Sequence, residues 1–389
     1  MKPSNFVNNT IAHLSHTDIA SDARILKELE SLRAQFVNCK IFGIGISRDD
    51  FRNKTVIKDV DLISLRIKSR NLSLIPASLR HILTFLEIFV RATKIIRTIK
   101  PQIIHCHDVY LLPIALYCQK MLKSKLIYDA HELESEASGI TKFQKKVIRY
   151  FEKKAWKSLN GLITVSPSIT NWYHKKYGVV NSVIVLNSPI VSDEYDKIFD
   201  DYLRRKFKIC HDSLVFIYIG IIGKGRGVDN LLAAFSSNDV KSHLVFLGYG
   251  EYVGKVKNLE EENKRIHFHE SVPYKDVIPI ARSADYGLCL LENISLSDYY
   301  CLPNKLFEYA FSGIPVLATN FPEIKDTVLR YKLGYVTGND PETIHKTVLK
   351  IESETKHERI KATSLYDLTW NKQKENLISL YNSVIEIDT

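Results

Sequence analysis

One turn in the second half of the chain has residue types that suit the binding of a phosphorylated ligand. It runs from Gly220 to Gly227 and joins an apolar run to a helical pattern. Glycines permit a tight turn, and we expect its backbone N–H groups to be free to meet a phosphate at the start of the helix. Lys224 and Arg226 add full positive charges, and arginine can hold phosphate through two hydrogen bonds. A plain strand-to-helix turn with surface cations is the alternative interpretation.

Two further turns follow in the same half. Gly248 lies in the next strand-to-helix turn, where a purely structural role is the simpler interpretation. Asn304 begins a helical pattern in which Lys305 and Glu308, three residues apart, share one helical face. A glutamate there can accept hydrogen bonds from a sugar or ribose diol while the lysine faces an anion. An exposed ion pair is the alternative, and such pairs contribute little.

Histidines and aspartates close two apolar runs in the first half of the chain, at 105–108 and 129–132. Such clusters are compatible with a metal site. A buried, hydrogen-bonded side chain is the simpler interpretation for His105. Before them, the first apolar run leads to Asp22 and Arg24, which suit a helix cap and a surface cation.

The elements that position these residues are short apolar runs alternating with helical patterns, which indicates parallel strands covered on both faces. Twelve runs are too many for one comfortable sheet, so we expect two similar sheets in tandem, with the break near Asn187. Ligands bind at the carboxyl ends of strands in such sheets. The predicted strands are 10–14, 39–43, 103–105, 126–129, 162–165, 183–186, 214–219, 244–247, 266–268, 286–290, 316–318 and 334–336.

Composition narrows the protein classes. Hydrophobic residues make up 45% and charged residues 25% of the 389 residues, which excludes extensive disorder. The six cysteines form no CxxC pair, which favours a reducing compartment. We expect no signal peptide and no membrane span.

The net charge of +10 has one conspicuous source, a predicted basic helix with interleaved apolar residues. Contact with an anionic membrane and a solvated cationic face on a packed helix are equally good interpretations. Its basic residues are Lys142, Lys145, Lys146, Arg149, Lys153, Lys154 and Lys157.

The stretch from Leu214 to Val328 closely resembles the nucleotide-sugar-binding domain of family 4 retaining glycosyltransferases. The resemblance implies an α/β fold of the GT-B type, with two doubly wound Rossmann-like domains facing each other across a cleft. It places an acceptor-side domain at 1–188, a nucleotide-sugar-binding domain at 189–369, and at 370–389 a helix that crosses back to the N-terminal domain.

Family motifs assign donor-side roles. Gly220, Arg226 and Gly227 match a glycine followed six positions later by a cation and glycine, and Lys224 substitutes for an arginine that the family often has where Ile221 stands. The segment Pro-Asn-Lys-Leu-Phe-Glu-Tyr at 303–309 resembles one branch of the family, in which the first glutamate of a Glu-x7-Glu motif is often absent. The implied catalytic residues are His131, Arg226 and Glu308, and the implied donor-binding residues are Gly220, Lys224, Gly227, Gly248, Tyr300, Asn304 and Lys305, with Tyr300 at the first glutamate position.

The same branch implies roles in the N-terminal half. His131 lies against the donor sugar, oriented by Asp129, and the acceptor side comprises His16, Asp22, Arg24, His107 and Asp108. No metal is expected, because the family works without one. We interpret the Asp-Val-Asp at 59–61 as surface rather than as a metal motif.

The implied reaction moves a sugar from a nucleoside-diphosphate sugar, with uridine favoured over guanosine, to a saccharide or lipid-linked saccharide in surface polysaccharide biosynthesis. The anomeric configuration is retained, and no cofactor besides the nucleotide-sugar co-substrate is expected. We expect a cytoplasmic protein, at the inner face of the cell membrane if the basic helix binds lipid, and no nucleic-acid partner. A GT-B sugar-nucleotide epimerase and a non-catalytic subunit of a glycosylation complex remain as alternatives.

Overall fold

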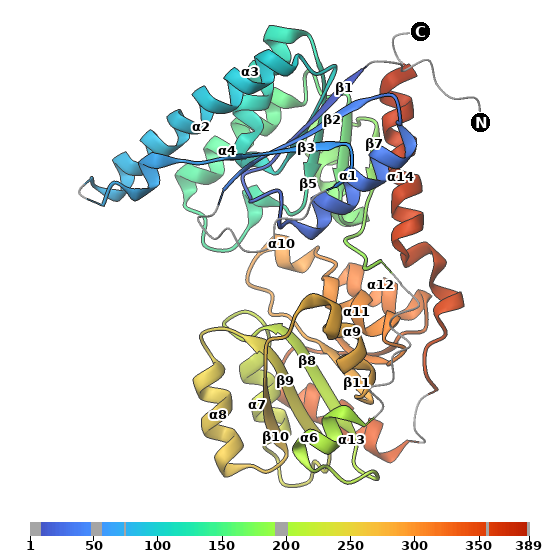
Figure 1. The fold of residues 1–389 in the computed structure, drawn as a ribbon. Helices are drawn as coiled ribbons and strands as arrows, with labels where there is room; N and C mark the ends of the chain where they lie inside the picture. The colour runs from blue at the N-terminus through green and yellow to red at the C-terminus, as the bar shows by residue number, and fades with distance from the viewer. Residues whose placement is uncertain (1–8, 48–56, 74, 191–200, 355–357, 387–389) are drawn as a thin grey trace. The chain divides into compact units, whose positions relative to one another are not determined.

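A computed structural model describes residues 9–47, 57–73, 75–190, 201–354 and 358–386 (Figure 1). The chain forms two compact units, Met1–Val185 with Lys374–Thr389, and Leu186–Gln373. The sequence boundaries were expected after residues 188 and 369, within four residues of these. Each unit is described by itself below.

The first unit is built on a seven-stranded parallel sheet in the order β3-β2-β1-β4-β5-β6-β7. The strand order reverses direction between β1 and β4, so the carboxyl ends of these two strands form the switch point where such sheets bind ligands. The strands are β1 (Thr10–Leu14), β2 (Lys40–Ile46), β3 (Val60–Leu65), β4 (Ile103–His107), β5 (Lys125–Ala130), β6 (Gly161–Thr164) and β7 (Ser182–Ile184).

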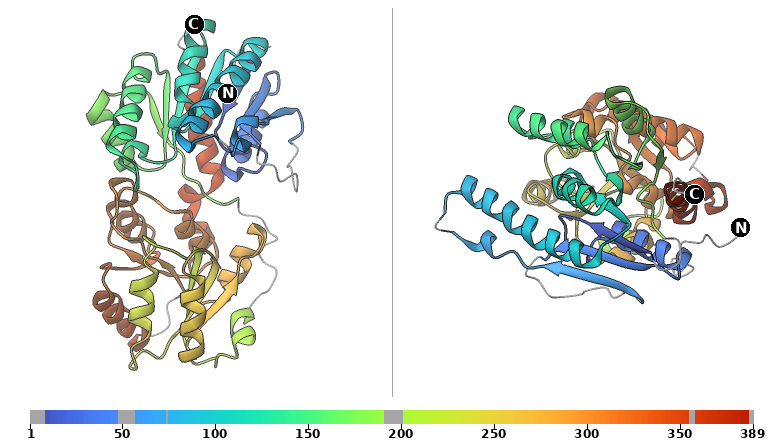
Figure 2. Two further views of the ribbon diagram at one scale, coloured as in Figure 1. Left: turned by 90° about the vertical axis from the view of Figure 1, so that its left-hand side faces the viewer. Right: turned by 90° about the horizontal axis from the view of Figure 1, so that it is seen from above.

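Helices cover both faces of this sheet. The helix α1 leads from β1 toward the β3 edge of the sheet, whereas α2, α3, α4 and α5 lead toward the β7 edge. Because parallel crossovers are right-handed, α1 lies on one face of the sheet and the other four helices lie on the opposite face. The last helix, α14, packs on the α1 side, where the ring of Tyr381 lies 6.1 Å from that of Phe36 (Figure 2). The helices are α1 (Ala23–Gln35), α2 (Ala77–Ile99), α3 (Leu112–Leu122), α4 (Lys142–Ala155), α5 (Pro167–Tyr177) and α14 (Trp370–Glu386).

The second unit repeats the plan with a six-stranded parallel sheet in the order β10-β9-β8-β11-β12-β13, whose switch point lies between β8 and β11. Its core is rich in aromatic residues, including Phe216, Tyr218, Phe246 and Tyr286. The strands are β8 (Val215–Ile221), β9 (His243–Tyr249), β10 (Ile266–Glu270), β11 (Tyr286–Cys289), β12 (Val316–Thr319) and β13 (Gly334–Thr337). The helices are α6 (Tyr202–Phe207), α7 (Val228–Phe235), α8 (Val253–Glu262), α9 (Tyr274–Arg282), α10 (Leu296–Tyr299), α11 (Asn304–Phe311), α12 (Pro322–Arg330) and α13 (Pro341–Ser353).

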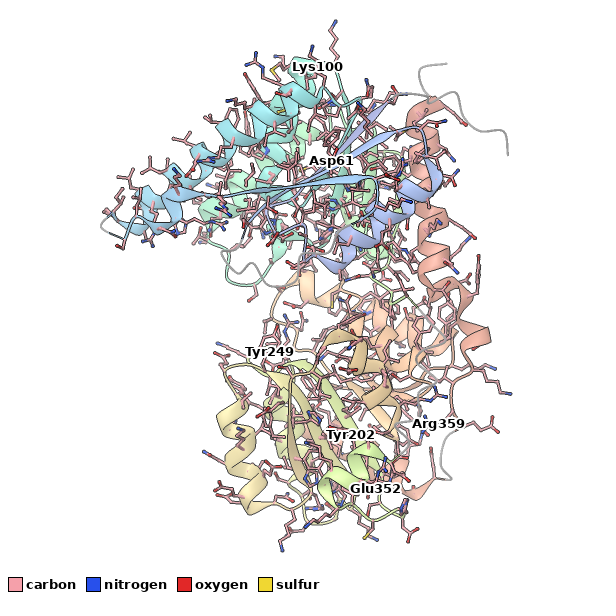
Figure 3. The ribbon with its side chains drawn as sticks, viewed as in Figure 1. Asp61, Lys100, Tyr202, Tyr249, Glu352 and Arg359 are labelled. Carbon is pink, nitrogen blue, oxygen red and sulfur yellow. The ribbon has the colours of Figure 1, made fainter. Side chains whose placement is uncertain are left out.

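The predicted class of two Rossmann-like parallel sheets is confirmed, and all twelve predicted strands are present within a few residues. The prediction missed β3, which begins inside the Asp-Val-Asp segment. Asp59 and Asp61 are exposed there, as expected, but Val60 is buried and pairs with Ile41 of β2 (Figure 3). A search of the described residues finds no helix long and apolar enough to span a bilayer.

Candidate active site

Side chains of opposite charge gather at the carboxyl ends of β4 and β5 in the first unit. Asp129, near the end of β5, is fully buried, and its carboxylate lies 3.0 Å from Nε2 of His131 and 3.2 Å from Nδ1 of His107. Arg24 of α1 reaches the same carboxylate through Nη2, at 3.0 and 3.2 Å. Of the helix cap and the surface cation that the sequence suggested at α1, the surface cation is wrong, because Arg24 forms a buried ion pair.

Charge in this cluster is set by burial and by its neighbours. Burial alone would raise the pKa of the Asp129 carboxyl, but Arg24 and His131 hold it well below its usual range. Burial raises the pKa of Glu28, which lies one helical turn after Arg24, to about 8, and the Asp129 charge adds to that rise. At neutral pH the cluster therefore contains an ionised Asp129 and a largely protonated Glu28.

His131 is cationic in this setting. Burial disfavours its charge, but the carboxylates of Asp108 and Asp129 outweigh that effect and raise its pKa to about 9. Its Nδ1 lies 3.5 Å from the Asp108 carboxylate, which also lies 3.7 Å from Nδ1 of His16. The His131 side chain is 20% exposed, so this charge is open to a ligand at the edge of the sheet.

Behind His131, three buried histidines and a tyrosine form a continuous chain. Nδ1 of His13 lies 2.9 Å from Nε2 of His107, and Nε2 of His13 lies 3.1 Å from the hydroxyl of Tyr381 on α14. That hydroxyl lies 2.8 Å from Nδ1 of His105. His105 is thus buried and hydrogen-bonded, as the sequence indicated. Burial lowers the pKa of His13, His105 and His107, so all three are neutral at physiological pH.

The directions of the hydrogen bonds in this chain are coupled. A neutral imidazole has one donor and one acceptor nitrogen. Nδ1 of His107 lies 3.2 Å from the Asp129 carboxylate and 3.3 Å from Nε2 of His131, so it either donates to Asp129 or accepts from His131. The tautomer of His107 then sets those of His13 and His105 through Nδ1 of His13 and the Tyr381 hydroxyl.

Two groups here have metal-ligand residue types with ligand atoms within 4.8 Å of one another: His13, Glu28, His105 and His107, and His107, Asp129 and His131. In the first group, ring nitrogens of His13 and His107 bond each other. In the second, the ring nitrogens lie against Asp129, which Arg24 already neutralises. In the first group, however, neither carboxylate oxygen of Glu28 nor Nε2 of His105 has a hydrogen-bond partner among the described residues, and Glu28 is held by an ion pair with Nε of Arg24 at 3.2 Å.

The structure thus brings together five of the predicted residues of this unit, His16, Arg24, His107, Asp108 and His131. The sixth, Asp22, caps α1 by accepting from the N–H groups of Arg24 and Ile25. The sequence prediction missed His13, Glu28 and Tyr381. The one local sign of a buried histidine cluster was His105-x-His107, because residues two apart on a strand have their side chains on the same face of the sheet.

In the second unit, the turn between β8 and α7 is closed by two carboxylates. The N–H of Lys224 donates to Glu251 at 3.1 Å, and the N–H of Gly227 donates to Glu292 at 3.3 Å. The N–H of Arg226 bonds the carbonyl of Gly223. The prediction that the N–H groups of this turn are free for phosphate is therefore wrong for these three, because acidic side chains from the β9 and β11 loops reach them first.

The cationic side chains of the turn are available, however. Within the described part of the chain, neither Lys224 nor Arg226 has an ion pair or a side-chain hydrogen bond. Nζ of Lys305, on α11, lies 3.8 Å from the ring centroid of Tyr218 in β8, and it too has no hydrogen-bond partner among the described residues. Lys224, Arg226 and Lys305 are therefore cations without an ion-pair partner among the described residues, and they lie near the carboxyl end of β8 together with the carboxylates of Glu251 and Glu292.

Glu308 lies on the buried side of the same helix. It is 7% exposed, and together with Lys305 it acts electrostatically on Cys289 at the end of β11, whose pKa burial raises to about 12. Asn304 is the exposed first residue of α11. Tyr300 caps the short helix α10, and its ring lies tilted against that of Tyr299, with the centroids 5.5 Å apart.

The two glycines at the strand ends differ in role. A Cβ on Gly248 would lie 1.9 Å from the carbonyl oxygen of Gly220, so this position requires glycine for the close approach of β8 and β9. Gly220 has φ +118°, and a Cβ there would meet nothing within 4 Å. The structural interpretation therefore holds for Gly248, whereas Gly220 borders open space next to the cations.

Comparisons with known proteins agree with this architecture. The sequence model described as "Glycosyltransferase Family 4" matches residues 45–194, and the one described as "Glycosyl transferases group 1" matches residues 200–364. The chain is 22% identical over 309 residues, 69% of its own length and 67% of the relative's, to the chitobiosyldiphosphodolichol beta-mannosyltransferase of Kluyveromyces lactis.

Solved structures share the fold along nearly the whole chain. Sucrose-phosphate synthase from Thermosynechococcus elongatus superimposes with a TM-score of 0.69 at 14% identity, covering 98% of both chains. HepE from Anabaena, solved with UDP and glucose, gives a TM-score of 0.64 at 13% identity, covering 97% of this chain and 98% of that one. Together, the two family models and these folds identify the chain as a glycosyltransferase of the GT-B, family 4 type.

Proposed function

We propose that this protein is a retaining, metal-independent glycosyltransferase that moves a sugar from a nucleoside-diphosphate sugar, most readily a UDP-sugar, to a lipid-linked saccharide. The observation that carries the proposal is the set of unpaired cations Lys224, Arg226 and Lys305 at the carboxyl end of β8. Charge develops on the leaving diphosphate during transfer, and fixed cations stabilise such charge in the transition state.

The acceptor proposal is supported by the name of the relative from Kluyveromyces lactis, which specifies a diphosphodolichol-linked saccharide. The equivalent substrate class for this chain is a saccharide on a lipid diphosphate, used in surface polysaccharide assembly. Such an acceptor lies in a membrane, so we place the protein at the cytoplasmic face of one.

The charge on His131 determines which role it can have. With a pKa of about 9, it is protonated at neutral pH and serves as a hydrogen-bond donor toward the donor sugar rather than as a general base. In the proposed reaction the acceptor hydroxyl attacks the face from which the diphosphate departs, and the diphosphate takes the hydroxyl proton. Glu308, which matches the family's second glutamate, would hold the ribose.

Thermal unfolding of the purified protein with UDP, GDP and their sugars, with and without EDTA, tests the donor site. A ligand at a hundred times its Kd stabilises the folded state by about 2.7 kcal/mol. We expect UDP to raise Tm equally with and without EDTA, and Arg226→Ala and Lys305→Ala to remove most of that rise. Lys264→Ala, at an exposed lysine elsewhere in the same unit, is the matched control and keeps it.

Three outcomes would contradict the proposal. No rise in Tm with any nucleotide would favour a non-catalytic subunit. Conversion of the sugar nucleotide in the absence of acceptor would indicate an epimerase. With an α-configured donor, a β-linked product would mean inversion and would exclude retention. This outcome has to be checked because the relative's name specifies a β-mannosyl product.

A further inference from the structure

Positive charge is concentrated on one face of the first unit. The helices α2, α3, α4 and α5 contain thirteen lysines and arginines but only two glutamates. Of these glutamates, Glu152 is buried, and Glu87 neutralises one charge by pairing with Arg91. This surplus of eleven charges exceeds the net charge of +10 of the whole chain. The face therefore presents a positive field to whatever binds it.

The same face exposes apolar side chains at helical spacing. On α2, Leu79, Ile82, Leu86 and Val90 are three, four and four residues apart, so they form one stripe, and all are exposed. A second apolar set, Phe143, Val147 and Tyr150, lies on α4 at spacings of four and three and is also exposed. Exposed apolar side chains aligned along a helix in this way mark an interaction site.

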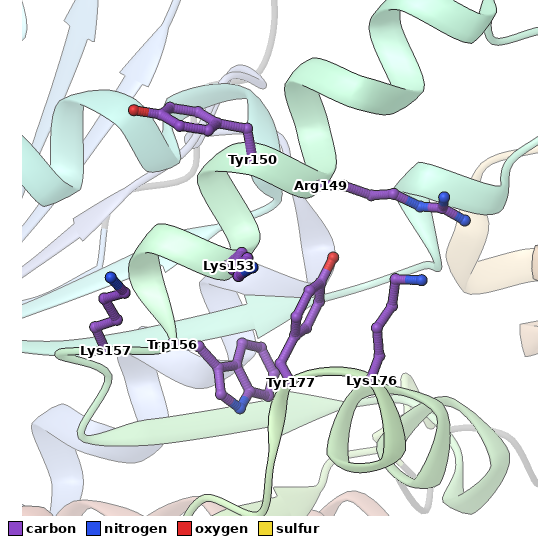
Figure 4. A pocket seen from close by; sticks show the side chains of 7 residues that line it. All are labelled: Arg149, Tyr150, Lys153, Trp156, Lys157, Lys176 and Tyr177. Carbon is purple, nitrogen blue, oxygen red and sulfur yellow. The ribbon is translucent and has the colours of Figure 1, made fainter.

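A hollow of about 580 Å³ lies between the ends of α4 and α5 (Figure 4). Its lining combines cations with amphipathic rings: Arg149, Tyr150, Lys153, Trp156, Lys157, Lys176 and Tyr177. Arg149 pairs with Glu136, but among the described residues Lys153 and Lys157 have neither an ion pair nor a hydrogen bond. Lysine ammonium groups around such rings suit an anionic phosphate at the boundary between water and hydrocarbon.

We propose that the face formed by α2, α3, α4 and α5 docks on an anionic lipid bilayer, with the α2 stripe inserted among the acyl chains and the hollow at the ends of α4 and α5 holding a lipid phosphate. Basic helices with one apolar side lie in the plane of the interface in this way. A nucleic-acid duplex would match the charge but would leave the apolar stripe in water. The inference rests on the proposed function only for the expectation that the acceptor is membrane-bound.

The basic helix that the sequence singled out, α4, is not the part that inserts into the bilayer. Lys145 and Arg149 of α4 are engaged by Glu136, so part of that helix's charge is neutralised within the protein. Insertion is assigned instead to α2, whose exposed stripe is apolar. In this arrangement α4 supplies electrostatic attraction through the lysines that remain unpaired.

Flotation of the full chain with vesicles tests the proposal without donor or acceptor. Vesicles of phosphatidylcholine alone are compared with vesicles that also contain phosphatidylglycerol, at low and high salt. We expect binding to the anionic vesicles only, and weaker binding at high salt. Each basic residue near an anionic surface contributes about 1 kcal/mol, so Lys153→Glu with Lys157→Glu lowers the partition coefficient more than about tenfold.

The apolar stripe is tested by a matched pair of variants. Ile82 on α2 and Leu329 on α12 of the second unit are both 57% exposed, so glutamate at either position leaves the core untouched. Ile82→Glu is expected to weaken vesicle binding about tenfold or more, and Leu329→Glu to leave it unchanged. Equal effects of the two changes, equal binding to neutral vesicles, or binding to duplex DNA in place of vesicles would overturn the proposal.

Failure here is distinguishable from failure of the proposed function. Vesicle binding is measured without any nucleotide, so a protein that floats but transfers no sugar would retain this inference and lose the other. Conversely, transfer to a soluble acceptor with no vesicle binding would keep the enzyme assignment and reject the docking face.

Discussion

The hydroxyl of Tyr381, on the last helix of the chain, lies 3.1 Å from Nε2 of His13, on the first strand. The sequence separates these residues by 368 positions, yet both side chains are buried and each satisfies the other. Through His107 the contact continues to Asp129 and His131. The orientation of the partly exposed His131 therefore depends on a tyrosine that no ligand needs to touch.

Replacing Tyr381 with phenylalanine removes the hydroxyl that hydrogen-bonds both His13 and His105. Two buried ring nitrogens lose their partners, and leaving such groups unsatisfied costs about 1–3 kcal/mol in the free energy of unfolding. Denaturant titration checks this, and ¹⁵N NMR of the histidines reports the tautomers. We expect the tautomer populations of His13 and His105 to change, whereas Tyr335→Phe, at a tyrosine whose hydroxyl has an exposed partner, changes neither the stability nor the tautomers.

Asp129→Asn leaves the Arg24 guanidinium buried without its main counter-charge. Breaking a buried pair from one side costs about 3–5 kcal/mol. The surface pair of Asp326 and Arg330 provides the control, and Asp326→Asn is expected to cost less than about 1 kcal/mol. A loss of similar size in both variants, measured by denaturant unfolding, would contradict the central position given to Asp129.

Protonation of His131 makes a pH-dependent contribution to stability. Its pKa in the folded protein, about 9, lies above the ordinary value of 6.5, so folding favours the proton. The contribution is therefore complete below pH 6.5 and disappears as the pH rises through 9. The stability difference between the native protein and His131→Asn should shrink by about 3 kcal/mol between pH 6 and pH 10. A difference independent of pH would mean that His131 is neutral.

The strand end at Gly248 allows a prediction about backbone packing. A Cβ there would lie 1.9 Å from the Gly220 carbonyl oxygen, so Gly248→Ala must displace β9 or β8 and is expected to destabilise the protein by about 1–3 kcal/mol. Gly254, in α8, has open space around it, and alanine there should stabilise by up to about 1 kcal/mol. Thermal unfolding of the two variants should therefore show shifts of opposite sign.

The sequence predicted the strands well because parallel strands that are buried on both faces consist of continuous runs of apolar residues. It failed at β3, an edge strand in which Asp61 is exposed, residues 62–64 are half-buried, and only Val60 and Leu65 are buried. For Arg24 it left open a surface cation beside the acceptor-side role, and burial of this side chain excludes the surface cation. Nothing near Arg24 in sequence reveals that Asp129 lies beside it.

In the candidate site too, contacts between residues far apart in the sequence could not be predicted. The family resemblance singled out His131, Arg226 and Lys305 but not the acidic groups that reach the β8 turn, because Glu251 and Glu292 come from other strand ends. A glycine-rich turn therefore indicates where an anion can bind, while the hydrogen bonds already present in the turn are visible only in the structure.

The most direct test of the central claim is transfer of radiolabelled sugar from a UDP-sugar to a lipid-diphosphate saccharide in the presence of EDTA, with Arg226→Ala and Glu308→Ala as test variants and Lys264→Ala as control. The account predicts transfer by the native protein and the control, at least about a hundredfold loss in each test variant, and a product with the donor's anomeric configuration. Transfer that survives both substitutions, or that requires an added divalent metal, would contradict the account.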